Sequence, residues 1–147
     1  MELRSVEELM DLLYACRGAR PGGGAGPGGA GDAHGHALRT AALLRRRRPA
    51  DKELQVAGLV CPVGRVLWPG DPGGRTAGAV EPLLGRRVGR LLRRHAGADG
   101  MPDDDVDRLG QADEEARTAV FDAGVLEDWR TVLELVAARS ARLGAAD

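Results

Sequence analysis

The chain has few aromatic side chains and little cysteine. Its 147 residues include two tryptophans, one tyrosine and one phenylalanine, so a hydrophobic core must be built from leucine, valine and alanine. Small aliphatic cores of this kind favour packed helices over sheets. The two cysteines, Cys16 and Cys61, lack the C-x-x-C spacing of a zinc ribbon and are too few for a disulfide scaffold. These shortages predict a single all-α protein.

An excess of charge of either sign is also absent. Lysine plus arginine number 21 and aspartate plus glutamate 22, and this balance gives no overall attraction to nucleic acid or membrane. No apolar run approaches the length of a membrane span, and the start of the chain, MELRSVEELM, lacks the apolar centre of a signal peptide. We therefore expect a cytoplasmic protein with reduced thiols and no membrane or nucleic-acid partner.

A tract of glycine, alanine and proline follows the first helical pattern. Ser5 and Glu8 have the spacing of a capping box, and apolar residues recur on one helix face after them. The tract cannot bury enough apolar surface to offset the entropy of ordering it, and it has no Gly-Lys-Ser or Gly-Lys-Thr of a phosphate loop. We expect an N-terminal helix within residues 1–17, a flexible linker over residues 18–32 and a helical domain over residues 33–147.

Two helices joined by a short turn are expected over residues 36–64. The first begins at His36 and carries alanine and leucine at helical spacing, until the turn at residues 49–51 interrupts it. The second is apolar along most of its length and is expected to close on Cys61 and Pro62. This pair of helices is the centre around which the remaining segments are organised.

Further helical segments follow this pair. A turn at residues 68–72 precedes expected helices over residues 77–84 and 88–95. The three aspartates at residues 103–105 suit the start of another helix, because carboxylates interact favourably with the helix dipole there, and the EF-hand pattern is absent. The last helix carries an amphipathic pattern made by Val132, Leu133, Leu135, Val136 and Leu143. The sequence thus predicts a bundle of about six to seven helices.

Four consecutive arginines at residues 45–48 have two interpretations. Cations at the end of a helix complement its dipole and its exposed carbonyl groups, so the run suits a solvated helix end. The other interpretation is a phosphate or nucleic-acid contact, joined by the arginines at residues 93–94. No aromatic stacking residues or recognition helix accompany these arginines, and steep salt dependence of binding would single the contact out.

Six short motifs occur in the order of a known family. They are HALRTA at residues 36–41, LVCPVG at 59–64, GAVEPLL at 78–84, LLRRHA at 91–96, LGQADEEAR at 109–117 and VLEDWR at 125–130. Together they resemble the HD-domain superfamily of metal-dependent phosphohydrolases, in particular the branch with the diiron oxygenases of phosphonate breakdown and myo-inositol oxygenase. The resemblance covers about residues 33–137 and implies an HD-domain-like helical bundle.

The resemblance implies only part of a metal site. In active members, histidine and aspartate side chains hold one or two metal ions that activate water or dioxygen. The residues that match such ligands here are His36, His95 and Asp113. The defining His-Asp pair is replaced by Cys61 and Pro62, and a further histidine is missing near residue 74, where Gly74 stands. The segment that contributes to the family's substrate pocket is also shortened after residue 96.

Two classes of function therefore remain open. The degenerate centre favours a non-catalytic member with a binding or regulatory role, without a cofactor, whose partner is a small molecule or a protein such as an active HD-domain relative. The alternative is an enzyme with altered chemistry. It is either a mononuclear hydrolase or oxygenase that holds iron, manganese or zinc on His36, Cys61, His95 and Asp113, or a metal-free catalyst with His95 as the acid-base group.

Each candidate residue also has a purely structural interpretation. Cys61 suits a small buried hydrophobic position, and an imidazolium at His95 is favoured by the end of its helix. His36 suits a hydrogen bond to backbone at its helix start, and Asp113 suits an exposed position on a polar helix. His34 has no counterpart in the family motif and is expected in the flexible segment before the helix.

Overall fold

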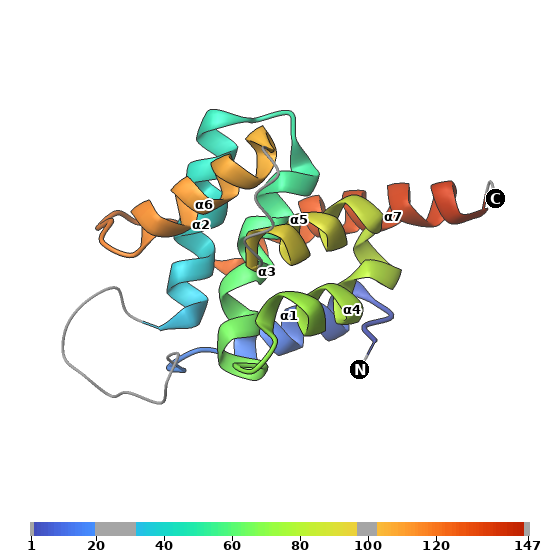
Figure 1. Cartoon of the computed structure of the whole chain (residues 1–147), viewed down its shortest axis with the longest axis horizontal. Helices are drawn as coiled ribbons and strands as arrows, with labels where there is room; N and C mark the ends of the chain where they lie inside the picture. The colour runs from blue at the N-terminus through green and yellow to red at the C-terminus, as the bar shows by residue number, and fades with distance from the viewer. Residues whose placement is uncertain (1, 20–31, 97–102, 146–147) are drawn as a thin grey trace.

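The computed structural model describes residues 2–19, 32–96 and 103–145, and this part of the chain contains helices and no strand (Figure 1). Most of the predicted linker over residues 18–32 lies outside the described residues. The helices are α1 Val6–Ala15, α2 Ala33–Arg47, α3 Lys52–Leu67, α4 Pro72–Leu84, α5 Arg86–Ala96, α6 Asp104–Ala116, the 3₁₀ helix η2 Leu126–Trp129 and α7 Arg130–Ala145. The prediction of an all-α bundle of about six to seven helices is confirmed.

Helix α3 runs through the middle of the bundle. It contacts α2, α4, α5, α6 and α7, with α2 and α6 on one side and α4 and α5 on the other (Figure 1). Its middle is buried on every side because its residues are small or aliphatic, and this removes a continuous apolar surface from water. The buried residues run without a gap from Leu54 to Gly64. Side chains near the end of α3 therefore reach the interior of the bundle.

The predicted end of this helix at Cys61 and Pro62 is wrong, because α3 continues to Leu67. A proline in a helix lacks the N–H that donates to the carbonyl four residues earlier, and this loss usually ends or bends the helix. Here the next turn is held by the core, where Val63 is buried. The additional turn also carries Arg65 toward the interior, which the sequence prediction missed.

Aspartate or serine side chains cap the N-termini of α1, α2, α3, α4 and α6. Helix α4 begins at Pro72, earlier than the predicted start at residue 77, because the Asp71 side chain accepts a hydrogen bond from the Gly74 N–H. Proline in the first turn costs no hydrogen bond, since that N–H has no partner in a helix. The predicted helix start at residues 103–105 is confirmed, with Asp103 as the cap of α6. The caps of α1, α2 and α3 are Ser5, Asp32 and Asp51.

The last helix is only partly amphipathic in the predicted sense. Leu133 and Val136 are buried, but Leu135 is 45% exposed and Leu143 66% exposed. Side chains two positions apart in a helix point about 200° away from each other, so Leu135 points away from the face of Leu133. Leu143 is exposed because the C-terminal end of α7 extends past the other helices (Figure 1). In the described ranges, no helix combines the length and the apolar character that crossing a membrane requires.

Candidate functional site

Asp113 of α6 lies between two histidines from different helices. His36 of α2 donates through Nε2 to Asp113 Oδ1 at 2.7 Å, and His95 of α5 donates through Nε2 to Asp113 Oδ2 at 3.1 Å. Both histidines must be the donors, because an ionised carboxylate only accepts. The structure thus brings together three of the residues chosen from the sequence. Asp113 is only 3% exposed, so its interpretation as an exposed residue is wrong.

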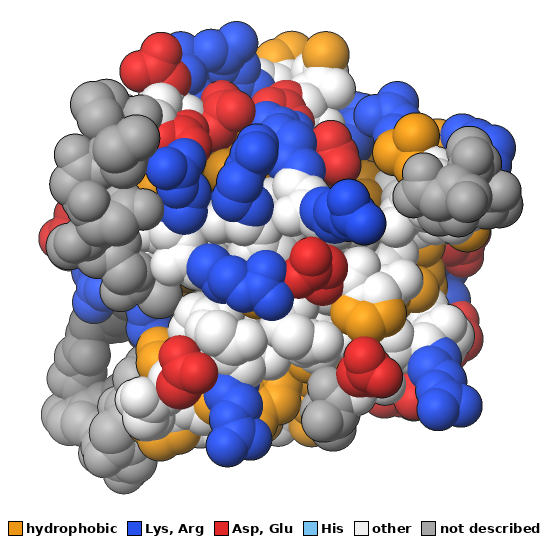
Figure 2. Space-filling model, turned by 45° about the vertical axis from the view of Figure 1, so that its right-hand side comes forward, with side chains coloured by type: hydrophobic (Ala, Val, Ile, Leu, Met, Phe, Trp, Pro, Cys, Tyr) orange, Lys and Arg blue, Asp and Glu red, His pale blue; other side chains and the backbone are white. Residues whose placement is uncertain are grey.

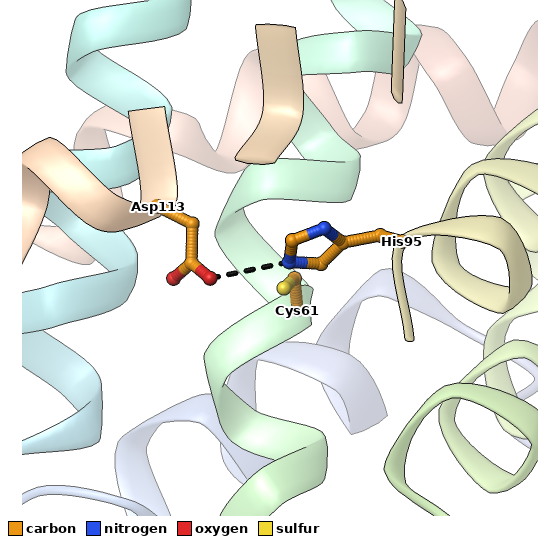
Figure 3. A group of neighbouring side chains, drawn as sticks. All are labelled: Cys61, His95 and Asp113. Atoms are coloured by element: carbon orange, nitrogen blue, oxygen red, sulfur yellow. Dashed lines mark hydrogen bonds and ion pairs between the residues drawn. The ribbon is translucent and has the colours of Figure 1, made fainter. Parts of the chain in front are cut away.

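Cys61 of α3 completes a convergent group with two of these residues. The Cys61 Sγ, a ring nitrogen of His95 and a carboxylate oxygen of Asp113 all lie within 4.8 Å of one another, and the three side chains point toward one another (Figure 3). His36 is not in this group and contacts Asp113 through the other carboxylate oxygen.

Arg65, one helical turn after Cys61, lies among these three atoms. Its Nη1 donates to Asp113 Oδ1 at 3.0 Å, and its Nη2 makes a short hydrogen bond to Asp113 Oδ2. The same Nη2 lies 3.7 Å from Cys61 Sγ and 3.2 Å from His95 Nε2. Because this histidine nitrogen already donates to the carboxylate, the second distance is a close approach of two donors. We call these five residues the Asp113 cluster: His36, Cys61, Arg65, His95 and Asp113.

The residues of the Asp113 cluster do not fit a metal ion while Arg65 is in this position. Sulfur, imidazole and carboxylate ligands converging on one point suit zinc, iron or manganese in principle. The Arg65 guanidinium group lies among these ligand atoms, and it keeps its positive charge at any physiological pH. Two unit charges about 4 Å apart repel by roughly 4 kcal/mol at an effective dielectric constant near 20. A metal ion would therefore have to displace the Arg65 side chain.

The charges of the cluster shift the pKa values of its members. Burial alone would raise the pKa of Asp113, but hydrogen bonds from His36, His95 and Arg65 together hold it well below its usual range. The hydrogen bond to Asp113 raises the pKa of Arg65 despite its burial. Hydrogen bonds to Asp113 and to Cys61 raise the pKa of His95 to about 9, against the opposing effect of burial. Asp113 is therefore ionised and His95 protonated at neutral pH.

The cluster does not have the geometry of a nucleophile-histidine-acid relay. In such a relay the histidine contacts the acid through one ring nitrogen and the nucleophile through the other. In Figure 3 the Cys61 sulfur and the Asp113 carboxylate lie beside the same nitrogen of His95. The other nitrogen is on the side of the ring that faces Gly110. Proton transfer from Cys61 through His95 to Asp113 is not supported by this arrangement.

A cavity of about 350 Å³ opens onto the cluster between α3, α4, α5 and α6. Besides four cluster residues, its lining includes Thr76 of α4 and Arg117 beyond the end of α6. Helix α4 is where the resemblance places the missing histidine near Gly74. It contributes Pro72, Gly73 and Thr76 to the lining and thus no imidazole. The cavity could hold a small molecule in contact with the Arg65 guanidinium.

His34 is not in a flexible segment, contrary to expectation. The Asp32 cap starts α2 at Ala33, so His34 is already helical. Its Nδ1 lies 2.9 Å from the Leu13 carbonyl oxygen, and its ring stacks on Tyr14 with 5.8 Å between ring centroids. His34 therefore links α2 to α1 and takes no part in the candidate site.

Most arginine side chains of the basic run at residues 45–48 contact other side chains of the bundle. The guanidinium of Arg45 lies 4.6 Å from the ring centre of Trp129, and that of Arg46 lies 4.6 Å from the ring centre of Phe121. Such cation-π contacts stabilise the folded state modestly. Arg47 forms an ion pair with Glu115 of α6. Three of the four arginines thus have partners within the bundle.

Comparison with known proteins adds nothing to this description of the site. No family model, curated protein or solved structure matches the chain. The resemblance to the HD-domain superfamily consequently rests on the sequence motifs.

Protonation of His95 predicts that stability declines in alkaline solution. The pKa of His95 is about 9 in the folded state and 6.5 in the unfolded chain. This difference stabilises the folded state fully below pH 6.5, and the stabilisation is lost as the pH rises through 9. The charged and titratable groups near the imidazole are Asp113 on α6 and Cys61 and Arg65 on α3. Because the guanidinium opposes protonation, we expect a loss of about 1–2 kcal/mol between pH 7 and pH 9.5.

Urea denaturation across this pH range measures the effect. A His95→Gln variant keeps a side-chain donor but cannot titrate, so the difference between the two proteins isolates the histidine from the cysteine thiols. Identical pH dependence in both proteins would contradict the assignment of a raised pKa to His95.

Proposed function

We propose that this protein is a non-catalytic relative of the HD-domain superfamily with a binding or regulatory role, in which Arg65 takes the place of a metal ion. The observation that carries the proposal is the position of the Arg65 guanidinium among Cys61 Sγ, His95 Nε2 and the Asp113 carboxylate. A fixed cation at this point compensates the carboxylate charge without chemistry at a metal.

Two further features support this proposal. The position of the defining His-Asp pair holds Cys61 and Pro62, and proline has no side-chain group that binds a metal. A cavity of about 350 Å³ lies beside the cluster and is lined by Arg65. A pocket without a metal ion can still bind a ligand. The partner of the protein would be a small molecule that enters this cavity or a protein such as an active HD-domain relative.

A second candidate is an enzyme with a mononuclear metal site. It is favoured by the convergence of Cys61, His95 and Asp113, whose ligand atoms lie within 4.8 Å of one another. It requires that the Arg65 side chain move out, after which zinc, iron or manganese would meet a suitable set of ligands. The metal-free acid-base alternative has less support, because a histidine with a pKa of about 9 exchanges protons poorly near neutral pH.

The metal content of the purified protein tests the proposal. After expression with iron, manganese and zinc in the medium, we expect the natural protein to contain far less than one metal ion per chain. We expect the Arg65→Ala variant to acquire zinc, because the repelling charge is gone while three ligands remain. Elemental analysis measures both, with circular dichroism to show that the variant is folded.

Arg117→Ala is the matched control. Arg117 lines the same cavity but pairs with Glu114 at 3.2 Å, so its loss leaves the guanidinium of Arg65 in place. This variant should remain free of metal like the natural protein. One metal ion per chain in the natural protein would contradict the proposal and favour the second candidate.

A further inference from the structure

A long groove lies outside the Asp113 cluster. Two cavities of about 760 and 510 Å³ share Glu53, Arg87 and Arg139 in their linings and therefore form one continuous depression. It follows the turn between α2 and α3, the start of α5 and the second half of α7. None of its lining residues belongs to the cavity at Asp113. We call it the arginine groove after Arg47, Arg48, Arg86, Arg87, Arg93 and Arg139.

Ion pairs within the protein fix part of the arginine groove. Arg87 donates to both carboxylate oxygens of Asp51, at 2.6 and 2.8 Å, and to Asp105 at 3.0 Å. Arg93 pairs with Glu81 at 2.7 Å. Asp51 and Glu81 of the lining are thus engaged by Arg87 and Arg93, and Asp105 of α6 also pairs with Arg87.

The six arginines of the groove outnumber the four acidic residues of its lining, which are Glu2, Asp51, Glu53 and Glu81. Within the described ranges of the chain, Arg86 and Arg139 are exposed and make no hydrogen bond or ion pair. Arg48 is exposed as well, and within those ranges it forms no ion pair; its charge acts on Asp51, whose principal partner is Arg87. Guanidinium groups of this kind bind carboxylates in a two-pronged geometry.

We propose that the arginine groove binds an acidic segment of a protein partner. The unpaired guanidinium groups of Arg86 and Arg139 provide the charge complementarity, and the exposed apolar side chain of Leu143 in the same lining provides a contact for residues between the acids. Complementary charge steers association and selects a partner. The inference is independent of the proposed function, because no residue of the Asp113 cluster contributes to it.

The composition of the groove favours a peptide over a nucleic acid. Among the described residues that line it, none is aromatic, so bases would have no ring to stack on. The glutamates of the groove would repel a continuous phosphate backbone. The carboxylates of a peptide are spaced along its chain, so a peptide can place them at the arginines and away from these glutamates. The molecular face in Figure 2 shows Lys and Arg side chains interspersed with Asp and Glu side chains, and hydrophobic side chains in small separate areas.

Fluorescence anisotropy with a labelled glutamate-rich peptide tests the inference on the full chain. The peptide carries the repeat Glu-Glu-Leu-Gly, and single-stranded DNA of similar length serves as the competing probe. We expect Arg86→Glu combined with Arg139→Glu to weaken peptide binding by about tenfold or more. The matched control combines Arg75→Glu with Arg90→Glu, which changes net charge equally at two exposed positions outside the groove.

The outcomes separate cleanly. Peptide binding that is lost in the groove variant and kept in the control variant supports the inference. No measurable binding to the natural protein, or equal weakening in both variants, overturns it. Stronger binding of the single-stranded DNA than of the peptide overturns it in favour of nucleic acid. Circular dichroism of each variant shows that altered binding does not arise from unfolding.

Discussion

Replacing Asp113 by alanine is expected to destabilise the protein by about 3–5 kcal/mol. The carboxylate is the acceptor for two histidines and for two nitrogens of Arg65, all inside the bundle. Without it, the Arg65 guanidinium loses its counter-charge, and the His95 imidazole, whose pKa is raised chiefly by its hydrogen bond to Asp113, gives up its proton beside that cation. Removing one member of a buried ion pair costs more than the pair itself contributes, because the other member stays desolvated. Urea denaturation at pH 7 measures the loss.

The double variant Asp113→Ala with Arg65→Ala distinguishes this cause from simple loss of packing. With both charges removed, no ion is stranded, so we expect the double variant to be more stable than Asp113→Ala alone. A double variant whose destabilisation equals the sum of the two single effects would contradict the electrostatic explanation. Asp113→Asn, which keeps the shape but not the charge, should fall between the natural protein and the alanine variant.

Replacing Gly64 by alanine is expected to cost about 3 kcal/mol, at the upper end of the range for overpacked sites. Gly64 of α3 faces α4, and a Cβ at this position would overlap the Oγ1 of Thr76 and lie 2.9 Å from the Pro72 carbonyl oxygen. The second of these atoms is backbone, so the helices must move apart. The start of α4 lines the cavity beside the Asp113 cluster, so we expect the same variant to change the shape of that cavity.

Gly78→Ala provides the control for helix propensity. Gly78 lies in α4, and a Cβ there would have no neighbouring atom within 4 Å. Alanine is the better helix former, so this variant should be unchanged or slightly more stable. Thermal and urea denaturation of both variants would show whether the penalty at Gly64 arises from the approach of α4. Equal effects at the two positions would rule that explanation out.

The helices were predictable where periodicity and capping agreed. The turn at residues 49–51, the aspartate start of α6 and the helical content are carried by local signals, namely turn residues, N-caps and apolar spacing. The continuation of α3 through Pro62 was not predictable in this way. It depends on burial of the turn that follows, which is a tertiary effect that outweighs the local cost of proline.

The candidate site was predictable in part. The motif resemblance selected His36, Cys61, His95 and Asp113, and the structure brings all four together. Arg65 was missed because the helix was expected to end before it. Its spacing of four residues from Cys61 was a usable signal, since such residues share a helix face. The exposure of Asp113 could not be judged from the polar sequence around it, because its burial depends on distant helices.

The wide separation of its members along the chain gives the Asp113 cluster a kinetic role. The contact between Asp113 and His36 spans 77 residues and that between Asp113 and Arg65 spans 48. Closing such loops costs entropy, so the neighbouring pairs α2–α3 and α4–α5 should form earlier during folding. Interactions absent from the transition state mainly slow unfolding. The hydrogen bonds between the Arg65 guanidinium and Asp113 would thus lengthen the lifetime of the native state, because they form late in folding and must break early in unfolding.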